Sequence, residues 1–273
     1  TIDGVEYTVS GLTAEVKGTD AGTYRNFIVG TTKVTDPAGN DVTDQFDVST
    51  NSGDLKIDKR SVTLTSADGA KVYDGIALTK NEQSDVTVTG GEGFVAGETL
   101  AYEISGTQTV VGSSENTFVA TSSETAKVDN YDVTYVYGTL TVTPKGIAPE
   151  PGNGMTVGEL PDVVYNGSEQ AQKPSVKDGD TELVEGVDYD LTYSEDLTNA
   201  GTVTVTVTGK GNYAGSVDVT YQITPAALTV STPSASKVYD GEALAAEGTV
   251  SGFVAGESAP FATTGSQTLV GSS

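Results

Sequence analysis

Tandem repetition is the feature of this sequence that most limits what the chain can fold into. Three motifs occur twice, in the same order along the chain. They are KVYDG at Lys71–Gly75 and Lys237–Gly241, GFVAGE at Gly93–Glu98 and Gly252–Glu257, and GTQTVVGSS at 106–114, which returns as GSQTLVGSS at 265–273. Repetition of this kind predicts small units in series that bury their cores partly against neighbours, rather than one large globular core.

A more divergent unit lies between the two copies. VYNG at Val164–Gly167 takes the place of VYDG, and NYAGSVDVTYQITPA from Asn212 echoes NYDVTYVYGTLTVTPKG from Asn130. The first stretch aligns as well, because DAGTYRN at Asp20–Asn26 matches VVGSSEN further along. We therefore predict four repeats: repeat 1 (1–58, the C-terminal part of a unit), repeat 2 (59–144, complete), repeat 3 (145–225, complete and related) and repeat 4 (226–273, the N-terminal part of a unit).

The local pattern within each repeat is that of β-strands. Segments such as SVTLTS, TVTVTVTG and SVDVTYQIT alternate apolar residues with Thr, Ser or charged residues, and Gly, Asn and Asp clusters separate them. No segment carries a helical stripe. We expect an all-β fold of tandem small antiparallel modules, with an immunoglobulin-like sandwich favoured and a β-grasp-like arrangement as the alternative. Pro144 and Pro225 fall at repeat junctions, where proline suits a short semi-rigid connection.

Composition excludes several classes of function. The chain has 38 acidic and 14 basic residues, a formal net charge of −24, and this surface repels nucleic acid and anionic membranes. It has no Cys and no His, which removes Ser-His and Cys-His nucleophiles, thiol redox chemistry and nearly all zinc, iron and copper sites. No apolar stretch has the length of a membrane span and no signal peptide opens the sequence, so we expect a mature or excised segment.

The KVYDG motif raises a choice between a reactive site and a structural turn. An Asp-Gly or Asn-Gly pair between apolar residues is a strong hairpin signal, since a type I′ turn needs positive φ at both central residues. Replacement of the carboxylate by an amide in repeat 3 keeps a turn and removes acid–base chemistry. We therefore predict structural turns, and no catalysis, at Tyr73, Asp74, Gly75, Tyr165, Asn166, Gly167, Tyr239, Asp240 and Gly241.

KVYDG, GFVAGE, GSQTLVGSS and the closing NYDVTYVYGTLTVTPKG together resemble the YDG and MBG-type tandem repeats of bacterial cell-surface, adhesin-like proteins. The resemblance covers almost the whole chain. It implies an extracellular stalk or spacer module on the bacterial surface, without enzymatic activity or cofactor, and attached to the cell wall through regions outside these residues. The alternative function is a glycan- or mucin-binding adhesive module. A glycosidase, which needs two carboxylates across a cleft, is disfavoured because units this short rarely build one.

The sequence also contains candidate residues for calcium binding and for an isopeptide crosslink. The loop DPAGNDVTD offers Asp36, Asn40, Asp41 and Asp44 as oxygen ligands for calcium, but the EF-hand order is absent and a solvated acidic loop explains it equally well. A Lys-to-Asn isopeptide crosslink would involve Lys71, Lys127 or Lys145 with Asn116 or Asn130. Repeat 3 lacks lysines equivalent to the first two, and ordinary surface lysines are the simpler hypothesis.

Aromatic residues are the natural sugar-binding candidates, because sugars stack on exposed rings. We expect most tyrosines to pack in the core, and leave two open, Tyr102 and Tyr189. The core set comprises Tyr24, Tyr131, Tyr135, Tyr137, Tyr193 and Tyr221. The expected partners are neighbouring repeats of the same chain, surface glycans, and a second copy joined head to tail through the partial end repeats, whose half-sheets have open edges. We expect no nucleic-acid partner and no membrane insertion.

Overall fold

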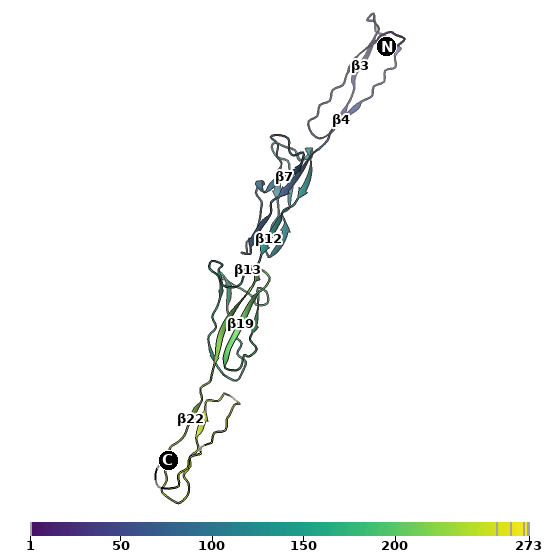
Figure 1. Cartoon of the computed structure of the whole chain (residues 1–273). Coiled ribbons are helices and arrows are strands. Elements are labelled where there is room, and N and C mark those ends of the chain that lie inside the picture. Colours follow the sequence, from purple (N-terminus) through teal and green to yellow (C-terminus); the bar gives the residue numbers. More distant parts are fainter. Residues whose placement is uncertain (1, 255, 263, 270, 272–273) are drawn as a thin grey trace. The chain divides into compact units, whose positions relative to one another are not determined.

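A computed structural model describes residues 2–254, 256–262, 264–269 and 271. The motif GFVAGE at Gly252–Glu257 and the end of GSQTLVGSS therefore lie partly outside the described residues. The fold is all-β, as predicted: small antiparallel and mixed sheets follow one another along the chain (Figure 1), with three one-turn 3-10 segments at Thr43–Gln45, Gln83–Asp85 and Val128–Asn130.

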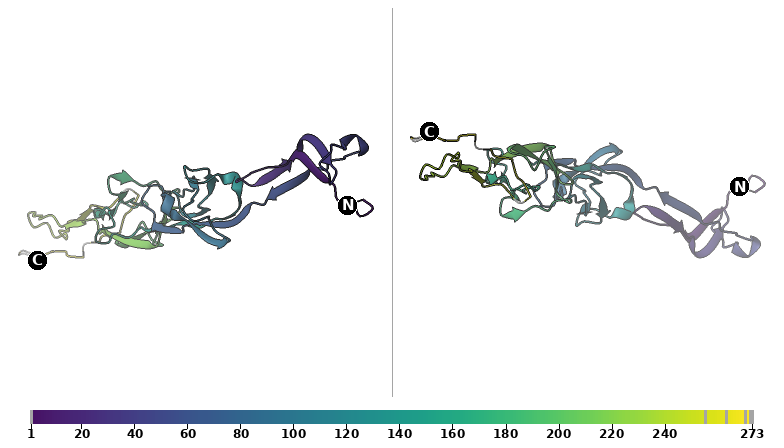
Figure 2. Two further views of the ribbon diagram at one scale, coloured as in Figure 1. Left: turned by 90° about the horizontal axis from the view of Figure 1, so that it is seen from above. Right: turned by 90° about the horizontal axis from the view of Figure 1, so that it is seen from below.

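Repeat 1 consists of two antiparallel strand pairs. β1 pairs with β3, and β2 pairs with β4. The first pair can be followed as a twisted ribbon in Figure 2. Among the described residues of repeat 1, Val34 is the only hydrophobic residue that is buried. The strands are β1 (Thr8–Thr13), β2 (Gly22–Asn26), β3 (Val29–Thr35) and β4 (Gly53–Ile57).

Repeat 2 contains three small sheets, with strand orders β11-β5-β7, β6-β12-β9 and β10-β8. The alternation of SVTLTS gives β5 its buried face, since Val62, Leu64 and Ser66 are buried while Ser61, Thr63 and Thr65 are half-buried. The strands are β5 (Arg60–Ser66), β6 (Gly69–Val72), β7 (Val86–Gly91), β8 (Ala101–Ile104), β9 (Gly112–Glu115), β10 (Phe118–Thr121), β11 (Tyr131–Val136) and β12 (Thr139–Thr143).

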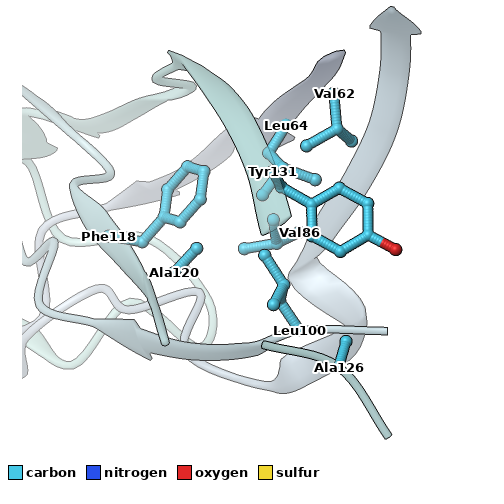
Figure 3. Packing of buried hydrophobic residues seen from close by; sticks show 8 residues of the cluster. All are labelled: Val62, Leu64, Val86, Leu100, Phe118, Ala120, Ala126 and Tyr131. Atoms are coloured by element: carbon cyan, nitrogen blue, oxygen red, sulfur yellow. The ribbon is translucent and has the colours of Figure 1, made fainter. Parts of the chain in front are cut away.

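The core of repeat 2 lies between two of these sheets. Figure 3 shows side chains from β5, β7 and β11 converging with those of β10, while the hydroxyl of Tyr131 points away from the apolar cluster. Phe118 is at the centre of an aromatic group, because Tyr102, Tyr135 and Tyr137 each meet its ring edge to face at centroid distances of 5.3–6.0 Å. Such edge-to-face pairs add to the stabilisation that burial provides.

Repeat 3 is built around the sheet β15-β21-β19-β18, with β14-β16-β17 and the β13-β20 pair beside it. Alternation again selects the buried face, since Val203, Val205 and Val207 of β19 are buried. Its strands are β13 (Lys145–Gly146), β14 (Met155–Val157), β15 (Val163–Val164), β16 (Val176–Asp178), β17 (Thr181–Glu182), β18 (Tyr189–Tyr193), β19 (Gly201–Gly209), β20 (Tyr213–Ala214) and β21 (Ser216–Thr224). The described part of repeat 4 has one antiparallel pair, β22 (Thr229–Ser231) and β23 (Thr249–Ser251).

Not all strand pairs are antiparallel. The pairs β5–β11, β13–β20 and β15–β21 are parallel, and each joins a strand near the start of a repeat to one near its end. This mixed pairing closes the repeat on itself, because the first strand is held by the last part of the same unit. The sequence pattern alone does not show it, since period-two alternation is the same in both orientations.

The chain divides into two compact units. One comprises Thr1–Lys71 with Gly75–Val142, and the other comprises Val72–Asp74 with Thr143–Ser273. The short segment Val72–Asp74 therefore belongs with repeat 3, although it is part of repeat 2 in sequence. This segment contains the tyrosine and aspartate of KVYDG.

Candidate functional site: the joints between repeats

The VY(D/N)G motif, which comprises Val72–Gly75, Val164–Gly167 and Val238–Gly241, is fixed to the end of its own repeat in the two complete repeats. The backbone N–H of Tyr73 donates to the carbonyl of Thr143 at 2.8 Å, and that of Tyr165 donates to the carbonyl of Thr224, also at 2.8 Å. In both repeats the acceptor is the residue before the junction proline. The motif therefore places its tyrosine beside the start of the following repeat.

The glycine of each motif adopts the left-handed conformation, with φ of 78° at Gly75, 76° at Gly167 and 81° at Gly241. Among the described residues Asp3 is the only non-glycine with positive φ, so the preceding Asp or Asn does not share it. A type I′ turn needs positive φ at both positions, and the predicted type I′ hairpin is therefore wrong. The strand before the first motif, β6, instead pairs with the distant β12.

In repeats 3 and 4 the Asn or Asp of the motif closes the bend through its side chain. Asn166 Oδ1 accepts a hydrogen bond from the backbone N–H of Ser168 at 2.9 Å, and Asp240 Oδ1 accepts one from the N–H of Glu242 at 3.0 Å. This is the geometry of an Asx turn, which either a carboxylate or an amide oxygen can make. The exchange of Asp for Asn in repeat 3 therefore preserves the contact that shapes the bend.

The joint between repeats 1 and 2 is a polar cluster. Asp20 accepts hydrogen bonds from Lys127 Nζ at 2.7 Å and from Asn130 Nδ2 at 3.0 Å, while Asn130 Oδ1 accepts from the backbone N–H of Ala21 at 2.8 Å. The hydrogen bond from Lys127, followed by that from Asn130, lowers the pKa of Asp20 below its ordinary value. Lys127 and Asn130 thus act as connectors to the preceding repeat.

Tyr131, next to this cluster, is bound by the GFVAGE loop. Its hydroxyl donates to the Glu98 carboxylate and accepts from the backbone N–H of Val95 at 3.2 Å. Its ring meets Phe94 edge to face at 5.2 Å. Burial, and then the Glu98 hydrogen bond, raise the pKa of Tyr131, so its hydroxyl stays protonated and able to donate to a higher pH than that of an ordinary tyrosine. A cavity of about 150 Å³ remains between this loop and repeat 1.

The joint between repeats 2 and 3 uses the tyrosine of KVYDG. The ring of Tyr73 meets Tyr213 edge to face at 5.8 Å. The Tyr213 hydroxyl donates to Asp178 at 3.1 Å, and Lys145 Nζ donates to the other oxygen of the same carboxylate at 2.5 Å. Burial, followed by the charge of Asp178, raises the pKa of Tyr213. Tyr73 therefore packs on an apolar ring whose polar end is held by an ion pair.

At the joint between repeats 3 and 4 the tyrosine of the motif makes a different contact, through its hydroxyl rather than its ring. The Tyr165 hydroxyl donates to the carboxylate of Glu257, and this hydrogen bond raises the pKa of Tyr165. Beside them lies a cavity of about 290 Å³, lined by residues of both repeats that include Leu228, Phe253 and Val254. Near each of these joints a tyrosine hydroxyl donates to a carboxylate: the pairs Tyr131–Glu98 and Tyr213–Asp178 lie within one repeat, and Tyr165–Glu257 connects two. In two of the joints the VY(D/N)G tyrosine contacts the next repeat.

The third VY(D/N)G tyrosine differs in exposure. Tyr239 is 62 % exposed, whereas Tyr73 and Tyr165 are half-buried. The joint carboxylates Asp20, Glu98, Asp178 and Glu257 were not singled out from the sequence. The glutamate that recurs in GFVAGE, Glu98 and Glu257, could have indicated a functional position. Its tyrosine partner is distant in sequence in both copies, so the pair itself has no local pattern.

The remaining candidates are engaged in local contacts. Asp36 accepts from the side-chain amide of Asn40 at 2.9 Å and from the backbone N–H groups of Asn40 and Ala38. Asp41 accepts from the hydroxyl and then the backbone N–H of Thr43. These hydrogen bonds lower the pKa of both carboxyls. No group of three or more acidic residues in the described ranges is arranged to hold a metal ion. The carboxylates of this loop therefore accept hydrogen bonds from the loop itself, and the described residues contain no cluster of ligands for calcium.

Each lysine proposed for an isopeptide bond has another partner. Lys71 Nζ donates to the carbonyl of Ile76, while Lys127 and Lys145 pair with the aspartates described above. Asn116 is fully buried, and its Nδ2 donates to the carbonyls of Ala67 and Lys80. These contacts assign the lysines and asparagines to ordinary hydrogen bonds and ion pairs.

Most tyrosines are at least half-buried, including Tyr189 and Tyr102, which the sequence left open. Tyr131 and Tyr221 are buried, Tyr24, Tyr135 and Tyr193 are half-buried, and Tyr137 is 39 % exposed. Within the described ranges the exposed aromatic residues are Phe27, Tyr137, Tyr239 and Phe261. They are spread over repeats 1, 2 and 4.

No family model and no curated protein matches this chain. The resemblance to YDG and MBG-type repeats therefore stays a prediction from the motifs. In the part of the chain that the structure describes, no helix has the length and apolar character needed to cross a membrane.

Proposed function

We propose that this chain is a series of structural stalk or spacer repeats from an extracellular, adhesin-like protein of a bacterial cell surface. The observation that carries the proposal is the recurring joint: Tyr73 and Tyr165, at the same position of their repeats, both contact the repeat that follows. In a reactive site the motif tyrosine would face solvent, whereas Tyr73 and Tyr165 contact residues of the following repeat. Stalk repeats need such connections more than they need a cleft.

The charge of the chain is consistent with this role. A net charge of −24 over 273 residues disfavours collapse of one repeat onto another and keeps a long array soluble. The ion pair Lys127–Asp20 connects repeats 1 and 2, and the pair Lys145–Asp178, within repeat 3, holds the carboxylate that accepts from Tyr213 beside Tyr73. Basic residues thus offset local acidity where repeats meet.

The rival function is binding of a surface glycan or mucin. The feature that favours it is the pair Tyr135 and Tyr137, whose rings are 6.3 Å apart and tilted by 30°, with Tyr137 partly exposed. Both rings, however, also pack on the buried Phe118. Replacement of Tyr137 by Ala, tested on a glycan and mucin panel, would abolish saturable binding if this module is adhesive.

A cell-surface display experiment tests the spacer function. A reporter domain is anchored to a bacterial wall above two, four or six tandem copies of residues 59–225, and its capture by ligand-coated beads is measured. A spacer predicts that capture rises with copy number in the same way for any reporter. Capture that is independent of copy number, or binding of the beads to the repeats themselves, would contradict it.

A further inference from the structure

In both complete repeats a strand near the beginning of the unit pairs directly with a strand near its end, in the parallel orientation. In repeat 2, β5 pairs with β11 over six residues, from Arg60 opposite Tyr131 to Thr65 opposite Val136. In repeat 3, β13 pairs with β20, and β15 pairs with the last residues of β21. This pairing determines how a repeat responds when its two ends are pulled apart.

Tension along the chain acts on β5 and β11 from opposite ends of their ladder. It enters repeat 2 at the N-terminal end of β5 and leaves beyond the C-terminal end of β11, through β12. Parallel strands that are pulled in this way slide along each other, so the bonds of all six facing pairs share the load. Two parallel strands that are pulled at the same end instead separate one pair at a time.

Side chains extend this connection beyond the last pair of the ladder. The hydroxyl of Ser66, which is buried, accepts from the backbone N–H of Gly138 at 3.0 Å and donates to the carbonyl of Asn116 at 2.6 Å. The Asp68 carboxylate accepts from the backbone N–H of Thr139 at 2.6 Å. These contacts connect the end of β5, and the residues after it, with the segment that follows β11, so sliding of the two strands must break them as well.

The first pair of the ladder is also held by side chains. Arg60 donates from Nε to the carbonyl of Gly93 at 2.8 Å and from Nη2 to the carbonyl of Glu92 at 2.7 Å. Tyr131, opposite Arg60, donates to the Glu98 carboxylate. Both facing residues are therefore bound to the loop that follows β7, and this loop connects the loaded end of β5 to β11.

We propose that the parallel ladder β5–β11, with the side-chain contacts at its two ends, is a tension-bearing clamp that makes repeat 2 resist stretching of the chain from end to end. The proposal deepens the stalk function and rests on it for its biological meaning, because a stalk transmits tension through every repeat. The resistance itself is a property of the fold, and it can be measured without a cell surface.

Repeat 3 has the same kind of pairing, but less of it shares the load. Its parallel ladders β13–β20 and β15–β21 comprise two facing pairs each. Residues 147–162 lie between β13 and β15, so tension reaches the second ladder only after the first has yielded. The ion pair of Lys145 with Asp178, at 2.5 Å, adds a side-chain contact at β13. We therefore expect repeat 3 to open at a lower force than repeat 2.

Optical-tweezer measurements on the whole chain test the clamp through the direction of pulling. The chain has no cysteine, so two introduced cysteines are the only points at which DNA handles attach. Lys59→Cys with Thr139→Cys loads the ladder in shear, whereas Lys59→Cys with Asp129→Cys pulls both strands at the same end; all three residues are exposed. We expect the unfolding force of repeat 2 to be at least about twofold higher in shear, because six pairs rather than one resist. Equal forces in the two directions would overturn the proposal.

The contribution of Ser66 is tested by adding Ser66→Ala to both pairs of cysteines. In shear the unfolding force should fall, because the hydrogen bonds to Gly138 and Asn116 carry part of the load. In the other direction the force should be unchanged, since separation begins at Arg60 and Tyr131, at the far end of the ladder. An equal loss in both directions would assign Ser66 to general stability and contradict its place in the clamp.

These results are distinguishable from a test of the spacer function. Capture of a reporter above tandem copies depends on the length of the array, whereas the ratio of the two unfolding forces depends on the pairing within one repeat. Equal forces with capture that rises with copy number would refute the clamp alone. A high force in shear with capture that is independent of copy number would refute the spacer alone.

Discussion

Replacement of Tyr73 by Ala should destabilise the repeat that follows it, although Tyr73 belongs in sequence to repeat 2. The change removes an edge-to-face pair with Tyr213, worth about 1 kcal/mol, and the burial of a half-buried ring, worth about 1 kcal/mol more. A loss of about 2 kcal/mol in a unit of this size lowers its melting temperature by roughly 10 °C. Differential scanning calorimetry of the whole chain measures the shift.

The same substitution at Tyr239 is the matched control. Tyr239 occupies the same motif but is 62 % exposed, so Tyr239→Ala should change stability by less than about 0.5 kcal/mol. The backbone hydrogen bond from Tyr73 to Thr143 survives its side-chain replacement, which limits the loss to the ring. Equal shifts for the two variants would refute the idea that the motif tyrosine joins repeats.

Three further predictions address the core, the pH dependence and the loop. Leu64→Ala should cost about 2–5 kcal/mol, because Leu64 is fully buried; a loss under 1 kcal/mol by chemical denaturation would count against the core assignment. The raised pKa values of Tyr131, Tyr165 and Tyr213 contribute stability that is complete below the ordinary tyrosine pKa of about 10 and is lost as pH rises through the folded values. Melting temperature should therefore fall above about pH 10, and less so in Tyr213→Phe. The loop of Asp36 has its own hydrogen-bond donors, so EDTA should leave the melt unchanged, and a lower melting temperature in EDTA would indicate bound calcium.

The strand positions and the buried faces were predictable because they depend on local alternation. SVTLTS and TVTVTVTG each specify one apolar face, and Leu64 and Val205 lie on those faces with no exposed surface. The all-β class follows from the same pattern. Tandem order was equally visible, since repeated motifs need no knowledge of the fold.

The joints were not predictable, because they depend on partners distant in sequence. Asp-Gly after an apolar strand has the local signal of a hairpin, yet β6, before Asp74, pairs with β12, and the bend at Asp240 is closed by an Asx contact. Glu98 accepts from Tyr131, which lies 33 residues further along the chain, so no local pattern indicates this pair. Local sequence patterns specify the turns and the buried faces of strands. Which strand or side chain each one contacts depends on how distant strands of the repeat pair with one another.

Small-angle scattering of two, four and six tandem copies of residues 59–225 tests the central claim most directly. A spacer whose joints hold consecutive repeats apart predicts a maximum dimension that grows in proportion to copy number, at low and at physiological salt. A maximum dimension that levels off, with the scattering of a compact particle, would contradict the account.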